Sequence, residues 1–327
     1  MNQPLSEMLR KNRIVLGNLP MLGISYQGAM KDNEYKERFQ DKAEMKKVIR
    51  VALNHGVRFF AASGRAFNQL ASNYLEAVKE IEAEDEKRLR LIPCIDVPLR
   101  FKGKRIDDYR RWKTHLEYEA RQFGKQIIQR YLEDPILNCR QGWKESINLA
   151  KPYKLDELIN KLEIDWKLWE ESINEFSNYN VTWIEPGSGT DFLAIARSDL
   201  LKELLDKTRK MGHHILLGSH HIGVSYQLIS KELLKGFDGF VTPINKLGVM
   251  MFQTQKMVEK AIKDIKKQGK LIVAIKPFAG GRIPPKEALT YVFKEIEADA
   301  CMIGVGSEAE AMKDFEVAGK VLASLPS

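Results

Sequence analysis

Short apolar runs alternate with longer amphipathic stretches along almost all of this 327-residue chain. The runs are rich in Val, Ile, Leu and Phe, while the stretches between them carry Lys and Glu on a helical face. Strands that alternate with helices pair in parallel, because each helix returns the chain to the starting edge of the sheet. Runs such as LIVAI and LRLIPCI are apolar throughout, as in strands covered on both faces. The alternation restricts the chain to an α/β fold with a parallel sheet.

Eight of these runs predict a (β/α)8 barrel, the TIM-barrel fold. They are residues 21–25, 57–61, 89–95, 181–184, 215–218, 239–243, 271–275 and 300–304, and a short run at 14–16 is expected to plug the barrel bottom. Gly56, Gly212 and Gly269 each follow a helical stretch and precede a strand, as helix-ending glycines do. One barrel accounts for the length, so we expect a single domain over residues 1–327.

Residues 97–180 interrupt the repeat between the third and fourth strands. A simple crossover needs far fewer residues, so we expect a helical insertion within the barrel domain. It contains Trp112, Trp143, Trp166 and Trp169. Either these tryptophans bury the insertion against the barrel, or the segment forms a lid or a partner surface over the barrel mouth.

Composition argues against several classes of protein. Cys94, Cys139 and Cys301 are far apart, which argues against a disulfide framework and a cysteine zinc site. No apolar stretch is long enough to span a bilayer and the N-terminus lacks signal-peptide features, so we expect a cytoplasmic protein without a membrane partner. The net charge is +8, but Lys and Arg alternate with Glu along helices, which indicates solvated faces and not nucleic-acid binding.

Several fragments resemble the aldo-keto reductase superfamily. VIRVALNHGVRFFAASGRAF is similar to that family's second strand with its preceding helix, and LLGSHHIGVSYQLISKELLKGFDGFVTPIN to its fifth and sixth units. IKPFAGGRIPPKEALTYVF and MIGVGSEAEAMKDFEVA are similar to the seventh and eighth units. The resemblance covers somewhat over half of the chain. It implies a TIM barrel. It also implies an NADP cofactor, and that inference rests on the resemblance alone.

The resemblance also implies four catalytic side chains, and this chain departs from all four. The family uses Asp, Tyr, Lys and His, with Tyr as the proton donor to a carbonyl. At the matching places the chain reads Phe59-Phe60-Ala61, Ala66-Phe67, Cys94-Ile95-Asp96 and Ile184-Glu185-Pro186. A phenylalanine ring has no hydroxyl to donate. The resemblance therefore predicts the family's fold for this chain but not its reductase chemistry.

Polar residues at the carboxyl ends of barrel strands point into the mouth, where TIM-barrel active sites lie. The predicted strand ends supply Ser25, Ser63, Asp96, Glu185, His221, Asn245 and Lys276. We take Glu185, Lys276, Asp96 and His221 as candidate catalytic residues. Glu185 or Asp96 is then a general acid/base, and Lys276 stabilises an anion or forms a Schiff base. The alternative is a structural salt bridge between these charges.

A phosphate-binding turn is predicted after the eighth strand. Gly304, Gly306 and Ser307 lead into a helix whose N-terminus presents free N–H groups, and Gly280, Gly281 and Arg282 follow the seventh strand. The alternative is an ordinary tight turn, with Glu308 and Glu310 at the helix start.

These features favour an enzyme that acts on a small polar or phosphorylated metabolite. Two other hypotheses stay open: a non-catalytic barrel that binds a ligand or protein, and a metal-dependent isomerase or lyase using Asp96, Glu185 and His221. The sequence names neither the substrate nor the oligomeric state.

Overall fold

Eight parallel strand positions form the centre of the molecule, in a computed structural model that describes residues 4–86 and 88–325. The sheet runs in the order β7-β3-β2-β1-β12-β11-β10-β9, and β8 extends the strand position of β7. The strands are β1 (Ile14–Gly17), β2 (Phe59–Ser63), β3 (Arg90–Ile95), β7 (Asn180–Val181), β8 (Glu185–Pro186), β9 (Leu216–Gly218), β10 (Gly239–Pro243), β11 (Leu271–Ile275) and β12 (Ala300–Gly304). The predicted TIM barrel is confirmed.

The fourth strand position closes the barrel. β7 and β8 both pair with β3, and the residue just before β8, Ile184, bridges to Ile215 in parallel. The Ile184 N–H donates to the His214 carbonyl at 2.8 Å, and the Leu216 N–H donates to the Ile184 carbonyl at 3.0 Å. The ring of strands is therefore continuous, although this position is interrupted.

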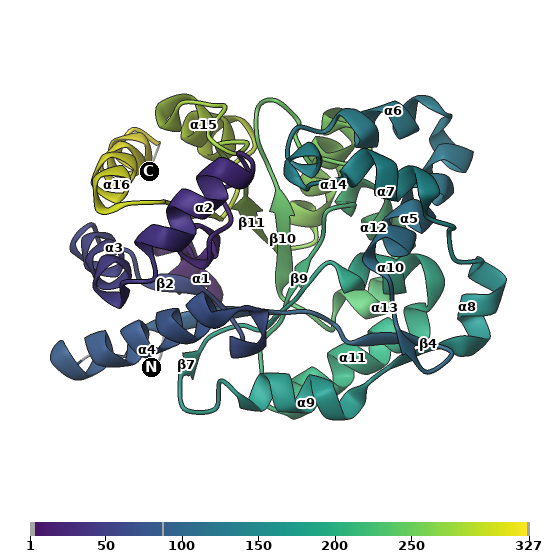
Figure 1. The fold of residues 1–327 in the computed structure, drawn as a ribbon, viewed down its shortest axis with the longest axis horizontal. Helices are drawn as coiled ribbons and strands as arrows, with labels where there is room; N and C mark the ends of the chain where they lie inside the picture. Colours follow the sequence, from purple (N-terminus) through teal and green to yellow (C-terminus); the bar gives the residue numbers. More distant parts are fainter. Residues whose placement is uncertain (1–3, 87, 326–327) are drawn as a thin grey trace.

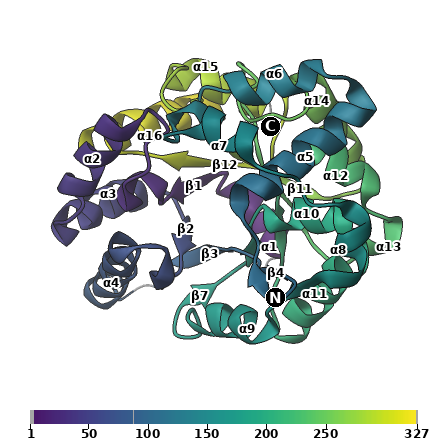
Figure 2. The same ribbon diagram turned by 45° about the vertical axis from the view of Figure 1, so that its right-hand side comes forward.

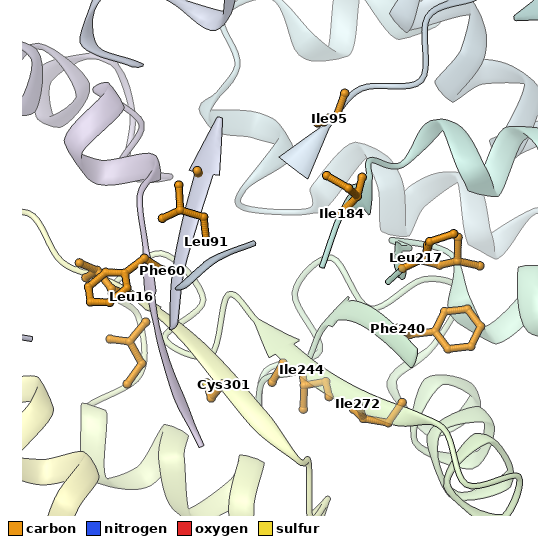
Figure 3. Packing of buried hydrophobic residues seen from close by; sticks show 14 of the residues in the cluster. Leu16, Phe60, Leu91, Ile95, Ile184, Leu217, Phe240, Ile244, Ile272 and Cys301 are labelled. Carbon is orange, nitrogen blue, oxygen red and sulfur yellow. The ribbon is translucent and has the colours of Figure 1, made fainter. Parts of the chain in front are cut away.

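Alternate residues along each strand serve two different cores. Val15, Phe59, Ile92, Trp183 and Val241 belong to one cluster that fills the barrel interior. Their sequence neighbours belong to a second cluster that packs between the strands and the outer helices, and Figure 3 labels several of them, including Leu16, Phe60, Leu91, Leu217 and Phe240. Because side chains alternate across a strand, both faces must be apolar, which explains the continuous hydrophobic runs.

Helices follow the strands and surround the barrel (Figure 1). They are α3 (Lys42–Asn54), α4 (Gln69–Glu84), α9 (Trp166–Asn174), α10 (Gly189–Ala196), α11 (Ser198–Lys210), α12 (Ile222–Leu228), α13 (Lys231–Leu234), α14 (Gln255–Lys267), α15 (Pro285–Thr290), the π-helical η4 (Tyr291–Glu295) and α16 (Glu308–Ala323); α2 (Ala29–Arg38) and the short η2 (Arg65–Phe67) lie in the loops after β1 and β2. Gly56, Gly212 and Gly269 have φ values of 82°, 88° and 74°, the left-handed conformation expected after a helix.

The first strand is not where the sequence placed it. Residues 14–17 form β1, which pairs with both β12 and β2, so this run is a barrel strand and not a plug. The predicted strand at 21–25 begins inside the 3-10 helix η1 (Leu19–Leu22), where Pro20 lacks a backbone donor and Gly23 ends the turn at φ 80°. The element at the barrel bottom is α1 (Leu5–Lys11), whose Leu9 joins the interior cluster.

Most of residues 97–180 forms a layer on one side of the barrel (Figures 1 and 2), whereas α9 in this range is one of the outer barrel helices. The layer contains β4 (Leu99–Phe101), β5 (Lys104–Arg105), α5 (Asp108–Phe123), α6 (Gln126–Glu133), η3 (Leu137–Cys139), α7 (Trp143–Leu149), α8 (Leu155–Lys161) and β6 (Leu162–Ile164) before α9. Strands β5, β4 and β6 form a small antiparallel sheet. Among the helices of the described residues, none is long and apolar enough to cross a bilayer.

Candidate functional site

Cys94 and Glu185 lie side by side at the upper end of the barrel interior. They are register partners on β3 and β8. Each is two residues beyond an interior side chain, Ile92 or Trp183, so both point inwards. A Cβ on Gly218 would lie only 2.9 Å from Glu185 Oε1, so a glycine on β9 leaves the space that the carboxyl group occupies.

Burial disfavours the ionised form of Glu185. It raises the pKa of this carboxyl to about 8, against the opposing effects of a hydrogen bond from Cys94 and the charge of Lys276. The negative charge of Asp96 acts in the same direction as burial. Burial and the nearby Glu185 also raise the pKa of the Cys94 thiol well above its usual value, so the thiol stays protonated. Glu185 therefore exchanges its proton close to neutral pH.

Lys276 follows β11 and His220 follows β9, and their side chains meet at the mouth. The Lys276 Nζ donates to the His220 Nε2 at 3.0 Å and lies 5.1 Å from the centre of the Tyr26 ring. Burial, Lys276 and other nearby cations lower the pKa of His220 well below its usual value, so the ring is neutral. Since Nε2 accepts from Lys276, Nδ1 carries the ring proton. That Nδ1 is buried and has no hydrogen-bond partner among the described residues.

Asp96 lies at the rim, directly after β3, and its side chain is exposed. Its Oδ1 approaches the Cα of Gly187, where a Cβ would come within 2.8 Å of that oxygen. The electrostatic effects of Asp96 and Lys276 on Glu185 place these three predicted residues at one end of the barrel. Their convergence follows from the fold, because the carboxyl ends of all eight strands meet there.

His221 faces away from these three groups. Its Nδ1 lies 2.7 Å from Glu119 Oε1 and 2.9 Å from the Tyr131 hydroxyl, both in residues 97–180. The metal set of Asp96, Glu185 and His221 is therefore not assembled. Among the described residues, the grouping with close donor atoms is instead His115, Glu119 and His221.

The other predicted strand-end residues have partners within the chain. Ser63 accepts from the Asn18 amide at 3.1 Å, and the Ser25 hydroxyl donates to Asp32 at 2.6 Å. Asn245 is fully buried and exchanges two hydrogen bonds with the backbone of Val249. The hydrogen bonds of these side chains therefore fix the conformation of the loops at the strand ends.

Helices α5 and α6, η3 and α7 form a roof over the mouth, and this roof is bound to the loops that follow the strands. Asp134 accepts from the Met250 N–H at 2.7 Å, and Arg130 Nη2 donates to the Gly248 carbonyl at 2.9 Å. Trp112, Tyr131 and Trp143 share one hydrophobic cluster with residues of the loops after β10 and β11, namely Val249, Met250, Phe252, Ala279 and Ile283. Of the four tryptophans named from the sequence, Trp166 alone is only partly buried.

The turn after β12 already holds a carboxylate of this chain. The Gly306 N–H donates to Glu310 Oε2 at 2.7 Å, and the Ser307 hydroxyl accepts from the Glu310 N–H as the N-cap of α16. The ring of Tyr35 packs on Gly306, where a Cβ would overlap it, and Pro20 packs on Gly304. A phosphate at this turn must displace Glu310, and its binding there stays a prediction.

Arg282 is tied to backbone carbonyls. Its Nη1 donates to Ala279 at 2.8 Å and to Tyr26 at 3.1 Å, which joins the loops after β11 and β1. Gly280 and Gly281 have φ values of 67° and 76°, and Gly280 lies against the Tyr26 carbonyl. The two glycines permit this tight turn.

Two functional candidates were missed by sequence reasoning. The predicted strand-end residues include His221 but not its neighbour His220, and they do not include Cys94. The signal for Cys94 was available, because it lies two residues before Asp96 in a strand that alternates faces. His220 had no such signal, because the chain leaves β9 at Gly218 and no longer alternates.

No protein-family model matches the sequence, and no curated protein matches it. Among solved structures, one described as "the putative aldo-keto reductase" from Pseudomonas aeruginosa is 11% identical over 95% of this chain and 90% of that chain, with a TM-score of 0.48. A second "putative aldo-keto reductase" from the same organism is 12% identical over the same shares, with a TM-score of 0.49. The chain is thus similar in structure to these proteins. Its own strand pairing establishes the barrel.

Proposed function

We propose that the barrel mouth is the active site of an enzyme that transfers protons on a small anionic metabolite. One observation carries the proposal: Glu185 is a carboxyl group buried at the carboxyl end of the barrel strands, beside Cys94. Burial raises its pKa to about 8. A group that titrates near neutral pH serves both as acid and as base. Perturbed carboxyl groups of this kind concentrate at active sites.

Lys276 and His220 supply the second half of the proposed chemistry. The Lys276 ammonium stabilises negative charge on the substrate, and the His220 Nδ1–H offers a neutral donor with no partner of its own. The positive charges of Arg111 and Arg140 also act at His220, so this side of the mouth favours an anion. Asp96 at the rim disfavours a second anionic group on its own side.

A nicotinamide cofactor is not part of this proposal. The family resemblance implies one, but the turn that would receive its phosphate is filled by Glu310 and Tyr35. The residues present do not fit a dinucleotide in this arrangement. We therefore propose no reaction step that uses a nicotinamide cofactor.

A substrate-depletion screen tests the proposal. Wild-type protein is incubated with a defined mixture of sugar phosphates, hydroxy acids and keto acids, with and without NADPH, and losses are followed by mass spectrometry. We expect Glu185→Gln and Lys276→Met to abolish the conversion that the wild type shows. Glu170→Gln and Lys260→Met, at exposed positions on α9 and α14, are the matched controls.

Two results would contradict the proposal. One is a conversion that survives both mouth substitutions. The other is tight binding of a mixture component without conversion, which favours the non-catalytic barrel.

A further inference from the structure

Three metal-ligating side chains meet in a buried cluster beneath the roof, apart from the Glu185 site. His115, Glu119 and His221 are 3%, 0% and 3% exposed. One donor atom from each lies within 4.8 Å of the others. A glutamate and two histidines in the interior are a costly arrangement unless each polar atom is bound.

The chain positions these donors from two separate elements. His115 and Glu119 are four residues apart on α5, so they share one helix face. His221 is the N-cap of α12, and its N–H, like that of His220, donates to the buried carboxylate of Asp191. Asp191 also accepts from the Ser219 hydroxyl at 2.6 Å. Asp191 therefore fixes the backbone of His221 at the start of α12.

Tyr131 adds a fourth donor. Its hydroxyl is fully buried and lies 2.6 Å from Glu119 Oε2 and 2.9 Å from His221 Nδ1. Two imidazole nitrogens, a carboxylate and a phenol oxygen form an N2O2 set. Zinc takes histidine nitrogens and carboxylate oxygens as ligands in tetrahedral sites, and the Tyr131 hydroxyl would supply the fourth donor.

The geometry requires one local movement. The rings of His115 and His221 are stacked at 4.2 Å with an angle of 9° between their planes. An ion about 2.1 Å from each nitrogen must lie near both ring planes, so one ring has to turn. His115 is held by ring contacts with His221 and Phe192, and turning it breaks no hydrogen bond found among the described residues.

We propose that His115, Glu119, His221 and Tyr131 bind one divalent transition-metal ion of the zinc class. All four ligands come from the protein, which is the pattern of a structural site and not of a catalytic one. The ion joins α5 and α6 in the roof to the loop after β9. His220, which contacts Lys276, directly precedes His221 in the chain. An ion bound to His221 therefore also holds His220 in place at the mouth. The site stands whether or not Glu185 is catalytic.

The test uses Co2+ as a spectroscopic probe and Zn2+ as a competitor. Chelator-treated full-length protein is titrated with Co2+, and we expect one equivalent to give the intense visible bands of four-coordinate cobalt. Zn2+ should abolish these bands and raise the melting temperature.

His115→Phe retains the ring contacts while removing a ligand. Glu119→Gln keeps the length and shape of the side chain, but it removes the charge and replaces one acceptor oxygen with an amide nitrogen that donates. Each should weaken metal binding by more than about 100-fold, beyond the loss seen for outer-shell changes. His213→Phe is the matched control, because His213 lies before β9, at the opposite end of that strand.

Either of two results overturns the site. In one, neither ion binds the wild type in the micromolar range. In the other, the cobalt bands persist unchanged in folded His115→Phe or Glu119→Gln protein. A native circular dichroism spectrum establishes folding of each variant. If Tyr131→Phe alone leaves the bands unchanged, the four-ligand set is wrong.

Discussion

Glu185 occupies a position where its charged form is unstable, and this has a measurable consequence. Its pKa is about 8 in the folded protein, against 4.5 for an ordinary glutamate. The folded state therefore binds this proton more tightly than the unfolded state. The resulting stabilisation is complete below about pH 4.5 and is lost as the pH rises towards 8.

We expect Glu185→Gln to remove this pH dependence. The amide has the shape of the protonated acid, so the variant should match or exceed wild-type stability at high pH. The difference should grow from near zero at about pH 4.5 to a few kcal/mol above about pH 8. Urea unfolding at several pH values measures it, with Glu170→Gln as the control. Parallel curves for wild type and Glu185→Gln would mean that Glu185 ionises normally, and the proposed acid/base would lose its basis.

Glu310 decides whether the turn after β12 is available to an anion. Its carboxylate occupies the Gly306 N–H and repels an incoming phosphate. Glu310→Ala should therefore strengthen inorganic phosphate binding by roughly three- to tenfold over wild type, as for one charge removed at a helix N-terminus. A 31P titration measures this. Glu308→Ala removes a charge from the same helix turn without freeing the N–H. Equal effects in both variants would show that only general charge matters, and no binding in either would make the turn purely structural.

At the scale of single elements, the roof is fastened by a few buried contacts. Asp134 accepts from the backbone N–H groups of Ile136, Leu137 and Met250, so it joins the roof to the loop after β10. Removing it leaves buried donors without an acceptor, at about 1–3 kcal/mol each.

Asp134→Ala should consequently destabilise the protein by about 3 kcal/mol or more. It should also speed proteolysis of the segment between α6 and α7. Denaturant unfolding and limited proteolysis measure the two effects. Asp156→Ala, at an exposed position on α8, should change neither. A loss below about 0.5 kcal/mol for Asp134→Ala would mean that the roof is held elsewhere.

Local pattern predicted some elements well and others poorly. β10, β11 and β12 have the predicted bounds. The reason is clearest for β11, a continuous apolar run between Lys270 and Lys276. β1 was misplaced because Met21 and Leu22 are as apolar as a strand, and only the pairing of residues 14–17 with two neighbours decides between them. No sequence pattern near residues 180–186 predicts the interruption between β7 and β8. The interruption depends on how Ile184 bridges to the next strand.

The site was predictable to the extent that the barrel determines it. Asp96, Glu185 and Lys276 were found because strand ends converge in this fold. The partners of His221 were not predictable, because Glu119 and Tyr131 are about a hundred residues away and reach it only through the packing of the roof. Contacts between a long insertion and the barrel that carries it produce no periodic pattern in the sequence.

At the scale of the whole molecule, the roof and the barrel share one hydrophobic cluster, and that sharing bears on cooperativity. Trp112 and Trp143 pack with residues from the loops after β10 and β11. Opening the roof alone would expose both sides of this cluster to water, at about 25 cal/mol per Å2 of apolar surface. We therefore expect roof and barrel to unfold as one unit.

Leu9→Ala tests this from the opposite end of the barrel. Leu9 is fully buried in the interior cluster, and its truncation should cost about 2–5 kcal/mol. If unfolding is cooperative, amide hydrogen exchange should accelerate by the same factor in α5 and in β11, although α5 lies far from the change. Leu149→Ala, at a position 82% exposed on α7, is the control and should alter neither segment. Faster exchange in β11 with unchanged exchange in α5 would show that the roof opens independently, and a roof that opens by itself can admit substrate without unfolding the barrel.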